Sequence, residues 1–206
     1  MRKLFLIFSL TFALLPVSAG NMLAAVGCDL NDPDRDVRRL FPDSTGYRTT
    51  YLSIDRIGGQ PLFERLQDRL GDRFTGLFET IDVPYTLYTV LKGRDVIGYI
   101  HGVNERGQHG GMQVFLVLDT KGAINDFYMQ RITSREASTL RSRDFGAQFS
   151  GLSLADFVPY NPVRRADIPG AIQPREGDDF FSVLRAVKKN LILMDIFVFS
   201  NKETAK

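Results

Sequence analysis

Residues 97–152 constrain the fold more than any other part of the sequence, because short extended segments follow one another there with turns between them. Residues 97–100 and 112–118 are rich in aliphatic, β-branched and aromatic side chains, which is typical of strands. Residues 120–122 have the composition of a turn, and residues 123–128 continue as another extended segment. This spacing predicts neighbouring strands joined by tight turns.

Further extended segments precede this stretch. Alternating side chains predict a strand over residues 47–57, with a turn at residues 58–59 behind it. Another strand begins at Pro84 and turns at residues 92–95, and a loop is expected at residues 104–111. Four consecutive strands with short turns favour an antiparallel meander, because parallel strands need long crossover connections.

Two predicted helices flank the strands. Apolar residues recur at helical spacing over residues 62–78, so this amphipathic helix should bury its apolar side, although Gly71 weakens it modestly. A second helix is expected to begin at a cap formed by Asp178, and its apolar tail at residues 191–199 should pack on the sheet. Between the strands and this helix, residues 159–177 contain four prolines and predict an irregular crossing. The sequence therefore predicts a single α+β domain, a twisted antiparallel sheet of about five strands flanked by helices.

The first residues have the pattern of a secretory signal peptide. Arg2 and Lys3 precede an apolar run over residues 4–15, and the small residues 17–19 follow. The run is too short to span a bilayer comfortably. The sequence therefore predicts a signal peptide over residues 1–19 and an exported protein, periplasmic or associated with the cell envelope.

The only cysteine, Cys28, has two interpretations. Together with residues 23–27 it resembles a loose bacterial lipobox, which predicts cleavage before Cys28 and a lipid anchor on its sulfur. The alternative is an ordinary small residue. A single cysteine excludes an intramolecular disulfide. The predicted organisation beyond the signal peptide is an N-terminal tether and short helix over residues 28–45, followed by the α+β domain over residues 46–200.

The charge balance argues against nucleic-acid binding. The chain has 26 basic and 24 acidic residues, and residues 1–27 contain two basic and no acidic side chains. The remainder is therefore formally neutral, and the basic isoelectric point comes largely from the leader. No basic patch with interleaved aromatic residues, of the kind that binds nucleic acid, is present in the sequence.

The order of elements over residues 84–195 resembles the FMN-binding domain of the small flavin-carrying subunits of bacterial Rnf and sodium-pumping NADH:quinone reductase complexes. Residues 97–100 resemble that family's "GY-x-G" approach, and a strand then closes on an acidic turn at Asp119. Residues 122–124 match its "G-x-I", and residues 145–151 match its "F-x-x-QF-x-G" helix end.

This resemblance implies an FMN-binding protein that relays electrons to or from a membrane redox protein or complex. Members with covalent FMN carry a "(S/T)GAT" motif before their last helix, whereas residues 177–182 here contain no threonine. The implied FMN is therefore non-covalent. The implied or neighbouring cofactor-binding residues are Gly110, Gly111, Arg131, Ser134, Glu136, Thr139 and Ser182.

Residues 133–140 occupy the position of the family's "ETPGLG" loop, with Glu136 in place of its glutamate. This segment is rich in hydroxyl groups and has arginines on both sides, a composition that suits an anion; the alternative is a solvated loop. The sequence also allows a degenerate family member that has lost FMN and acts as a ligand- or protein-binding envelope lipoprotein. No nucleophile elbow, phosphate-binding loop or zinc-helix motif occurs in the sequence. The sequence therefore does not assign an enzymatic activity.

Overall fold

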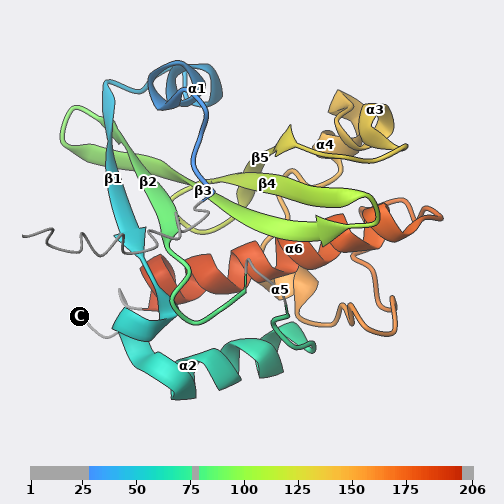
Figure 1. Ribbon diagram of the computed structural model, residues 1–206. Coiled ribbons are helices and arrows are strands. Elements are labelled where there is room, and N and C mark those ends of the chain that lie inside the picture. The colour runs from blue at the N-terminus through green and yellow to red at the C-terminus, as the bar shows by residue number, and fades with distance from the viewer. Residues whose placement is uncertain (1–27, 76–78, 201–206) are drawn as a thin grey trace, which may run out of the picture.

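The sheet at the centre of the molecule is an antiparallel meander in which the strands lie in the order of the sequence. The computed structural model describes residues 28–75 and 79–200 (Figure 1), and the predicted signal peptide lies outside these ranges. The predicted α+β fold is confirmed. The strands are β1 (Gly46–Leu52), β2 (Tyr85–Lys92), β3 (Asp95–Gly107), β4 (Gly110–Leu118) and β5 (Ile124–Arg131).

Helices cover both faces of this sheet. Helix α6 runs along one face with α2 beyond it, and α1 lies on the opposite face (Figure 1). Short helices α3, α4 and α5 connect β5 to α6, and a π-helical turn at Asp195–Phe199 extends α6. The helices are α1 (Pro33–Leu40), α2 (Ile54–Leu70), α3 (Ala137–Leu140), α4 (Arg143–Ala147), α5 (Leu154–Phe157) and α6 (Asp178–Met194).

Side chains of the central strands alternate between two apolar layers, as the pleat of a strand requires. Val103 and Val114 are buried on the face covered by α2 and α6. Ile100 and Phe115 are buried on the other face, where they pack against the segment 28–41. The sheet therefore has a large core on one side and a smaller core on the other.

The structure corrects three predicted boundaries. The strand expected over residues 47–57 ends at Leu52, because the Ser53 hydroxyl accepts a hydrogen bond from the Arg56 amide at 3.3 Å and caps α2. The turn expected at residues 58–59 is a kink inside α2 instead. The helix expected to reach residue 78 ends at Leu70, where Gly71 adopts a left-handed conformation with φ 74°.

Two further expectations about boundaries were also wrong. The loop expected at residues 104–111 shrinks to a two-residue turn, because Gly107 and Gly110 pair across the β3–β4 hairpin. The residue that caps α6 is Gly177 rather than Asp178, which lies in the first turn.

A buried ion network joins α6 to β3 and to residue 79. Lys189 Nζ lies 2.6 Å from Glu79 Oε1 and 3.1 Å from Glu105 Oε2. Arg185 Nη1 lies 2.8 Å from each of the same two carboxylates, and its Nε lies 2.7 Å from Asp72 Oδ2. Burial raises the pKa of Glu79, but Lys189 and Arg185 outweigh that effect and hold its pKa below the usual value. The paired charges satisfy one another within the core.

Directly after Lys189 on α6, Asn190 holds the buried side chain of His101. Asn190 Nδ2 donates to the His101 carbonyl at 2.8 Å, and Asn190 Oδ1 lies 2.8 Å from His101 Nδ1. The imidazole is fully buried, and this burial lowers the pKa of His101 to about 4. His101 is therefore neutral at pH 7.

Replacing the buried ammonium should destabilise the fold strongly. Lys189→Met leaves two buried carboxylates with a single cation, so we expect the free energy of unfolding to fall by about 3–5 kcal/mol. Urea unfolding measures the change. Lys121→Met, at an exposed turn position, is the control and should stay within about 0.5 kcal/mol of the unmodified protein. Similar midpoints for the two variants would contradict the role of the ion network.

The stability of the fold should fall between pH 7 and pH 5 because of His101. The unfolded chain protonates this imidazole with a pKa of about 6.5, whereas the folded protein does so only near pH 4. Within this window the unfolded state binds more protons, so acidification favours unfolding, by about 2 kcal/mol from pH 7 to pH 5. Urea unfolding at both pH values should show a smaller pH effect in His101→Gln. An equal pH effect in both proteins would rule out His101 as its source.

Candidate functional site

The structure brings together three segments that contain residues expected to bind flavin. They are the β3–β4 hairpin, the loop after β5 and the start of α6. A Cβ atom built on Gly110 would lie 3.3 Å from Thr133 Cβ, so the hairpin approaches that loop closely. A Cβ atom built on Gly177 would lie 2.7 Å from the carboxylate of Glu136, which places the loop beside the start of α6.

We call the place where the β3–β4 hairpin, the loop after β5 and the start of α6 meet the hairpin junction. The remaining expected residues lie around this junction or close to it in sequence. Gly111 pairs with Arg106 in the hairpin, and Arg131 is the exposed last residue of β5. The Ser134 hydroxyl accepts a hydrogen bond from the Glu136 amide at 3.0 Å. Thr139 lies in α3 and the half-buried Ser182 lies in α6. Their assignment to a flavin stays a prediction.

Carboxylates already occupy the start of α6. Asp179 is 3% exposed, and its Oδ1 accepts a hydrogen bond from the Gln108 amide at 2.6 Å. Asp178 pairs with Arg165 at 2.6 Å. A phosphate group at this helix end would meet like charge, so the junction suits the ring of a ligand better than its phosphate.

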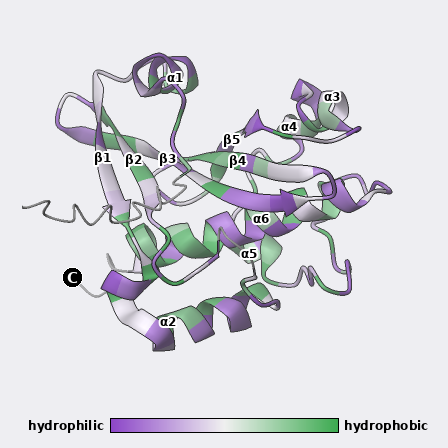
Figure 2. Ribbon diagram, in the orientation of Figure 1, coloured by the Kyte–Doolittle hydropathy of each residue, from purple (hydrophilic) through white to green (hydrophobic). Residues whose placement is uncertain are grey.

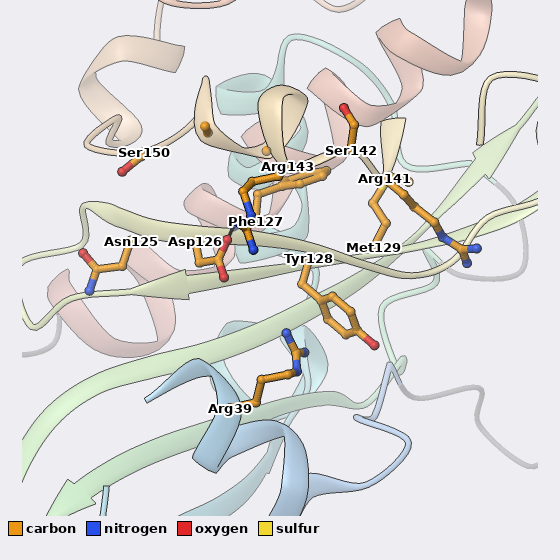
Figure 3. A pocket seen from close by; sticks show the side chains of 12 residues that line it. Arg39, Asn125, Asp126, Phe127, Tyr128, Met129, Arg141, Ser142, Arg143 and Ser150 are labelled. Atoms are coloured by element: carbon orange, nitrogen blue, oxygen red, sulfur yellow. Dashed lines mark hydrogen bonds between the residues drawn. The ribbon is translucent and has the colours of Figure 1, made fainter. Parts of the chain in front are cut away.

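A separate groove of about 590 Å³ crosses the outer edge of β5. Figure 3 shows Arg39 on one side of this strand and Arg141 and Arg143 on the other, with the ring of Tyr128 directed toward Arg39. The volume is typical of small-molecule sites. The lining residues are Arg39, Asn125, Asp126, Phe127, Tyr128, Met129, Arg141, Ser142, Arg143, Gly146, Ala147 and Ser150.

The groove carries an excess of positive charge. The Arg39 guanidinium lies 4.6 Å from the centre of the Tyr128 ring, a cation–π contact. Arg141 donates to the Gln130 carbonyl at 3.0 Å. Arg143 makes no ion pair with any residue in 28–75 or 79–200. Against these three cations the lining has one carboxylate, Asp126.

Aromatic packing fixes the wall formed by α4. Phe127 of β5 stacks on Phe149 with ring centres 4.7 Å apart, and Phe145 meets both rings edge to face. The Ser142 hydroxyl accepts a hydrogen bond from the Phe145 amide at 3.2 Å and starts α4. The aromatic residues of the "F-x-x-QF-x-G" motif are therefore core residues that place Arg141 and Arg143 beside β5.

Sequence reasoning assigned neither Arg39 nor Tyr128 to a site. The only available indication was the group of arginines around residues 131–143, which suited an anion. Arg39 lies about ninety residues earlier in the chain, and no local pattern connects it to that group. Tertiary structure brings it to the groove.

Cys28 is buried on the face of the sheet opposite α6. Its side chain is 3% exposed, and a Cβ atom built on Gly102 would lie 2.8 Å from its sulfur. Burial raises the pKa of the thiol. A lipid attached to this sulfur would require Cys28 to leave its position, so lipidation stays a prediction that the unmodified fold does not accommodate.

Neither a metal centre nor a membrane span is found within the parts of the chain that the structure describes. No cluster of three or more metal-ligating side chains occurs there. His101 is buried whereas His109 is exposed at the hairpin turn. No helix in these ranges has the length and apolar character needed to cross a bilayer.

The two neighbouring aspartates at the start of α6 should differ in their contribution to stability. Asp179→Ala removes the buried acceptor of the Gln108 amide, so we expect a loss of about 1–3 kcal/mol in the free energy of unfolding. Asp178→Ala removes an exposed ion pair and should cost less than about 1 kcal/mol. Urea unfolding compares the two variants. Equal losses would mean that Asp179 is not a structural cap of the hairpin.

Comparison of the chain with models of known protein families, and with curated protein sequences, found no match. The FMN-binding interpretation therefore depends on the motifs within this chain and on the geometry around β5.

Proposed function

We propose that this protein binds FMN, or a closely similar phosphate-bearing aromatic ligand, non-covalently in the arginine groove at β5. The observation that carries this proposal is a groove at the edge of β5 that is lined by Arg39, Arg141 and Arg143, with the Tyr128 ring against Arg39 and a single carboxylate among the lining residues. A ligand that combines a dianionic phosphate with a flat ring matches both the arginines and the aromatic side chain of that lining.

The arginines suit the phosphate. Guanidinium groups form two parallel hydrogen bonds to phosphate oxygens, and such charge-assisted bonds are stronger than neutral ones. Arg143 is the natural first contact, since it has no ion-pair partner among the described residues. Arg141 reaches the same groove from two residues earlier in the chain.

Tyr128 suits the ring. Its side chain is half-buried, and the Arg39 guanidinium covers its aromatic face. A flat ring could stack on either of these planar groups. The junction between the hairpin and the loop after β5, where a Cβ atom on Gly110 would lie 3.3 Å from Thr133, offers an alternative position for part of the ligand.

With FMN bound, the flavin would carry the electrons, and the protein would hold the ring and tune its potential. The signal-peptide pattern supports a proposed location outside the cytoplasm, in the periplasm or at the cell envelope. A membrane redox protein or complex is the proposed partner. A lipid on Cys28 is the proposed means of membrane attachment, and it would require Cys28 to leave its buried position.

The second candidate is a degenerate family member that has lost FMN and binds another anionic ligand or a protein without redox chemistry. The carboxylates at the start of α6 favour this alternative, because Asp179 and Asp178 stand where covalent members carry their phosphate-bonding motif. Both candidates use the same groove, and they differ in whether the protein selects a flavin.

Quenching of FMN fluorescence tests the proposal. The purified protein should quench FMN in a saturable manner, and Arg143→Ala should weaken the affinity about tenfold or more, since it removes a charge-assisted contact. Arg94→Ala, at an exposed turn position that does not line the groove, should leave the affinity unchanged. No saturable quenching would remove FMN and favour the second candidate.

Two further variants separate the groove from the hairpin junction. If the phosphate lies in the groove, Arg143→Ala should weaken binding more than Gly111→Val. If Gly111→Val and Arg131→Ala abolish binding while Arg143→Ala does not, the ligand lies at the junction and the groove assignment is wrong.

A further inference from the structure

We propose that the N-terminal strap, residues 28–41, forms part of the arginine groove when it is docked on the sheet. Ligand binding in the groove and docking of the strap on the sheet then stabilise each other. This inference depends on the proposed function, because it concerns the regulation of the same site. The strap lies on the face of the sheet opposite α6 and contributes Arg39 to the groove.

Gln130 connects the strap to a groove arginine. Its Oε1 accepts a hydrogen bond from the Asn31 amide at 2.8 Å, and its Nε2 donates to the Asp29 carbonyl at 2.8 Å. The backbone carbonyl of the same residue accepts a hydrogen bond from Arg141. One residue of β5 therefore holds both the start of the strap and an arginine that lines the groove.

Arg39 connects the other end of the strap to the groove. Its guanidinium covers the Tyr128 ring, and its Nη2 lies 3.7 Å from Oδ1 of Asp36, which is 1% exposed. The other carboxylate oxygen of Asp36 has no hydrogen-bond partner among the described residues. The same Oδ1 also lies 3.4 Å from Arg35 Nη2, so Asp36 holds two arginines of α1 within the strap. The contact of Arg39 with Tyr128, by contrast, joins the strap to β5 and requires the strap to be docked.

Two glycines of β3 make the seat for the strap. Gly98 and Gly102 are four residues apart on one strand, so they face the same side of the sheet. A Cβ atom on Gly98 would lie 2.5 Å from the Phe41 ring, and one on Gly102 would lie 2.8 Å from the Cys28 sulfur. The two ends of the strap therefore rest directly on bare backbone.

These contacts have a thermodynamic consequence. A ligand that touches Arg39 binds the docked form more tightly than the undocked form, and so it shifts the equilibrium toward docking. By linkage, docking of the strap raises the affinity for the ligand by the same factor. A chain with an undocked strap would keep Arg141 and Arg143 and lose Arg39 from the site.

The rate at which Cys28 reacts with a thiol reagent measures the equilibrium between the docked and undocked strap. Cys28 lies at the start of the strap and is buried, so a thiol reagent reaches it only when the strap opens. The experiment uses protein in which mass spectrometry shows that Cys28 is unmodified. Saturating FMN should slow the labelling of Cys28 in this protein at least tenfold. Gln130→Ala should accelerate labelling in the absence of FMN.

Neighbouring arginines of α1 provide a matched pair of variants. Arg39→Ala should abolish the effect of FMN on Cys28 labelling, because the ligand then has no contact with the strap. Arg38→Ala, at the adjacent exposed position of the same helix, should preserve it. Inorganic pyrophosphate, which carries the charge without the ring, serves as a second probe.

The outcomes separate the two proposals. Saturable quenching of FMN fluorescence with unchanged Cys28 labelling would overturn the strap proposal and leave the binding function intact. Slower labelling with pyrophosphate but no quenching of FMN would support the strap proposal and remove the flavin. Labelling that neither probe changes, in protein that does not quench FMN, would overturn both.

Discussion

The buried ion network of α6 is the interaction on which the rest of the structure depends. Without Glu79 and Glu105, Lys189 would be an uncompensated charge in the core and Arg185 would keep only Asp72 as a partner. The two carboxylates would in turn be costly to bury without these cations. The network therefore sets where α6 lies along β3, and it fixes the segment that leads into β2. Figure 2 shows hydrophilic and hydrophobic stretches alternating along α6.

Helix α6 aligns the sheet from one end to the other. Asp179 caps the β3–β4 hairpin at one end, and Asn190 holds His101 further along. Because α6 fixes the sheet from one face, the opposite face and the β5 edge are left for other contacts. The strap occupies that second face, and the arginine groove lies where the strap, β5 and α4 meet. The candidate site therefore lies where the strap meets the sheet, and it contains residues of both.

Local patterns predicted the strands well, but they could not connect the residues that line the groove at β5. The meander over β2 to β5 follows from apolar segments and short turns, which act between neighbours in the sequence. The ends of α2 depend on Ser53 and Gly71, whose capping roles were not recognised. The burial of Lys189 had no local indication at all, because its partner Glu79 is 110 residues away. For the same reason Arg39 could not be connected with Arg143 before the fold was known.

Backbone NMR of the isotopically labelled protein during addition of FMN would show whether an anionic aromatic ligand binds at the β5 groove. We expect the largest chemical-shift changes at residues 125–129 and 141–143 and at Arg39. Changes confined to the hairpin at residues 108–111, or the absence of any change at millimolar FMN, would contradict binding at this groove.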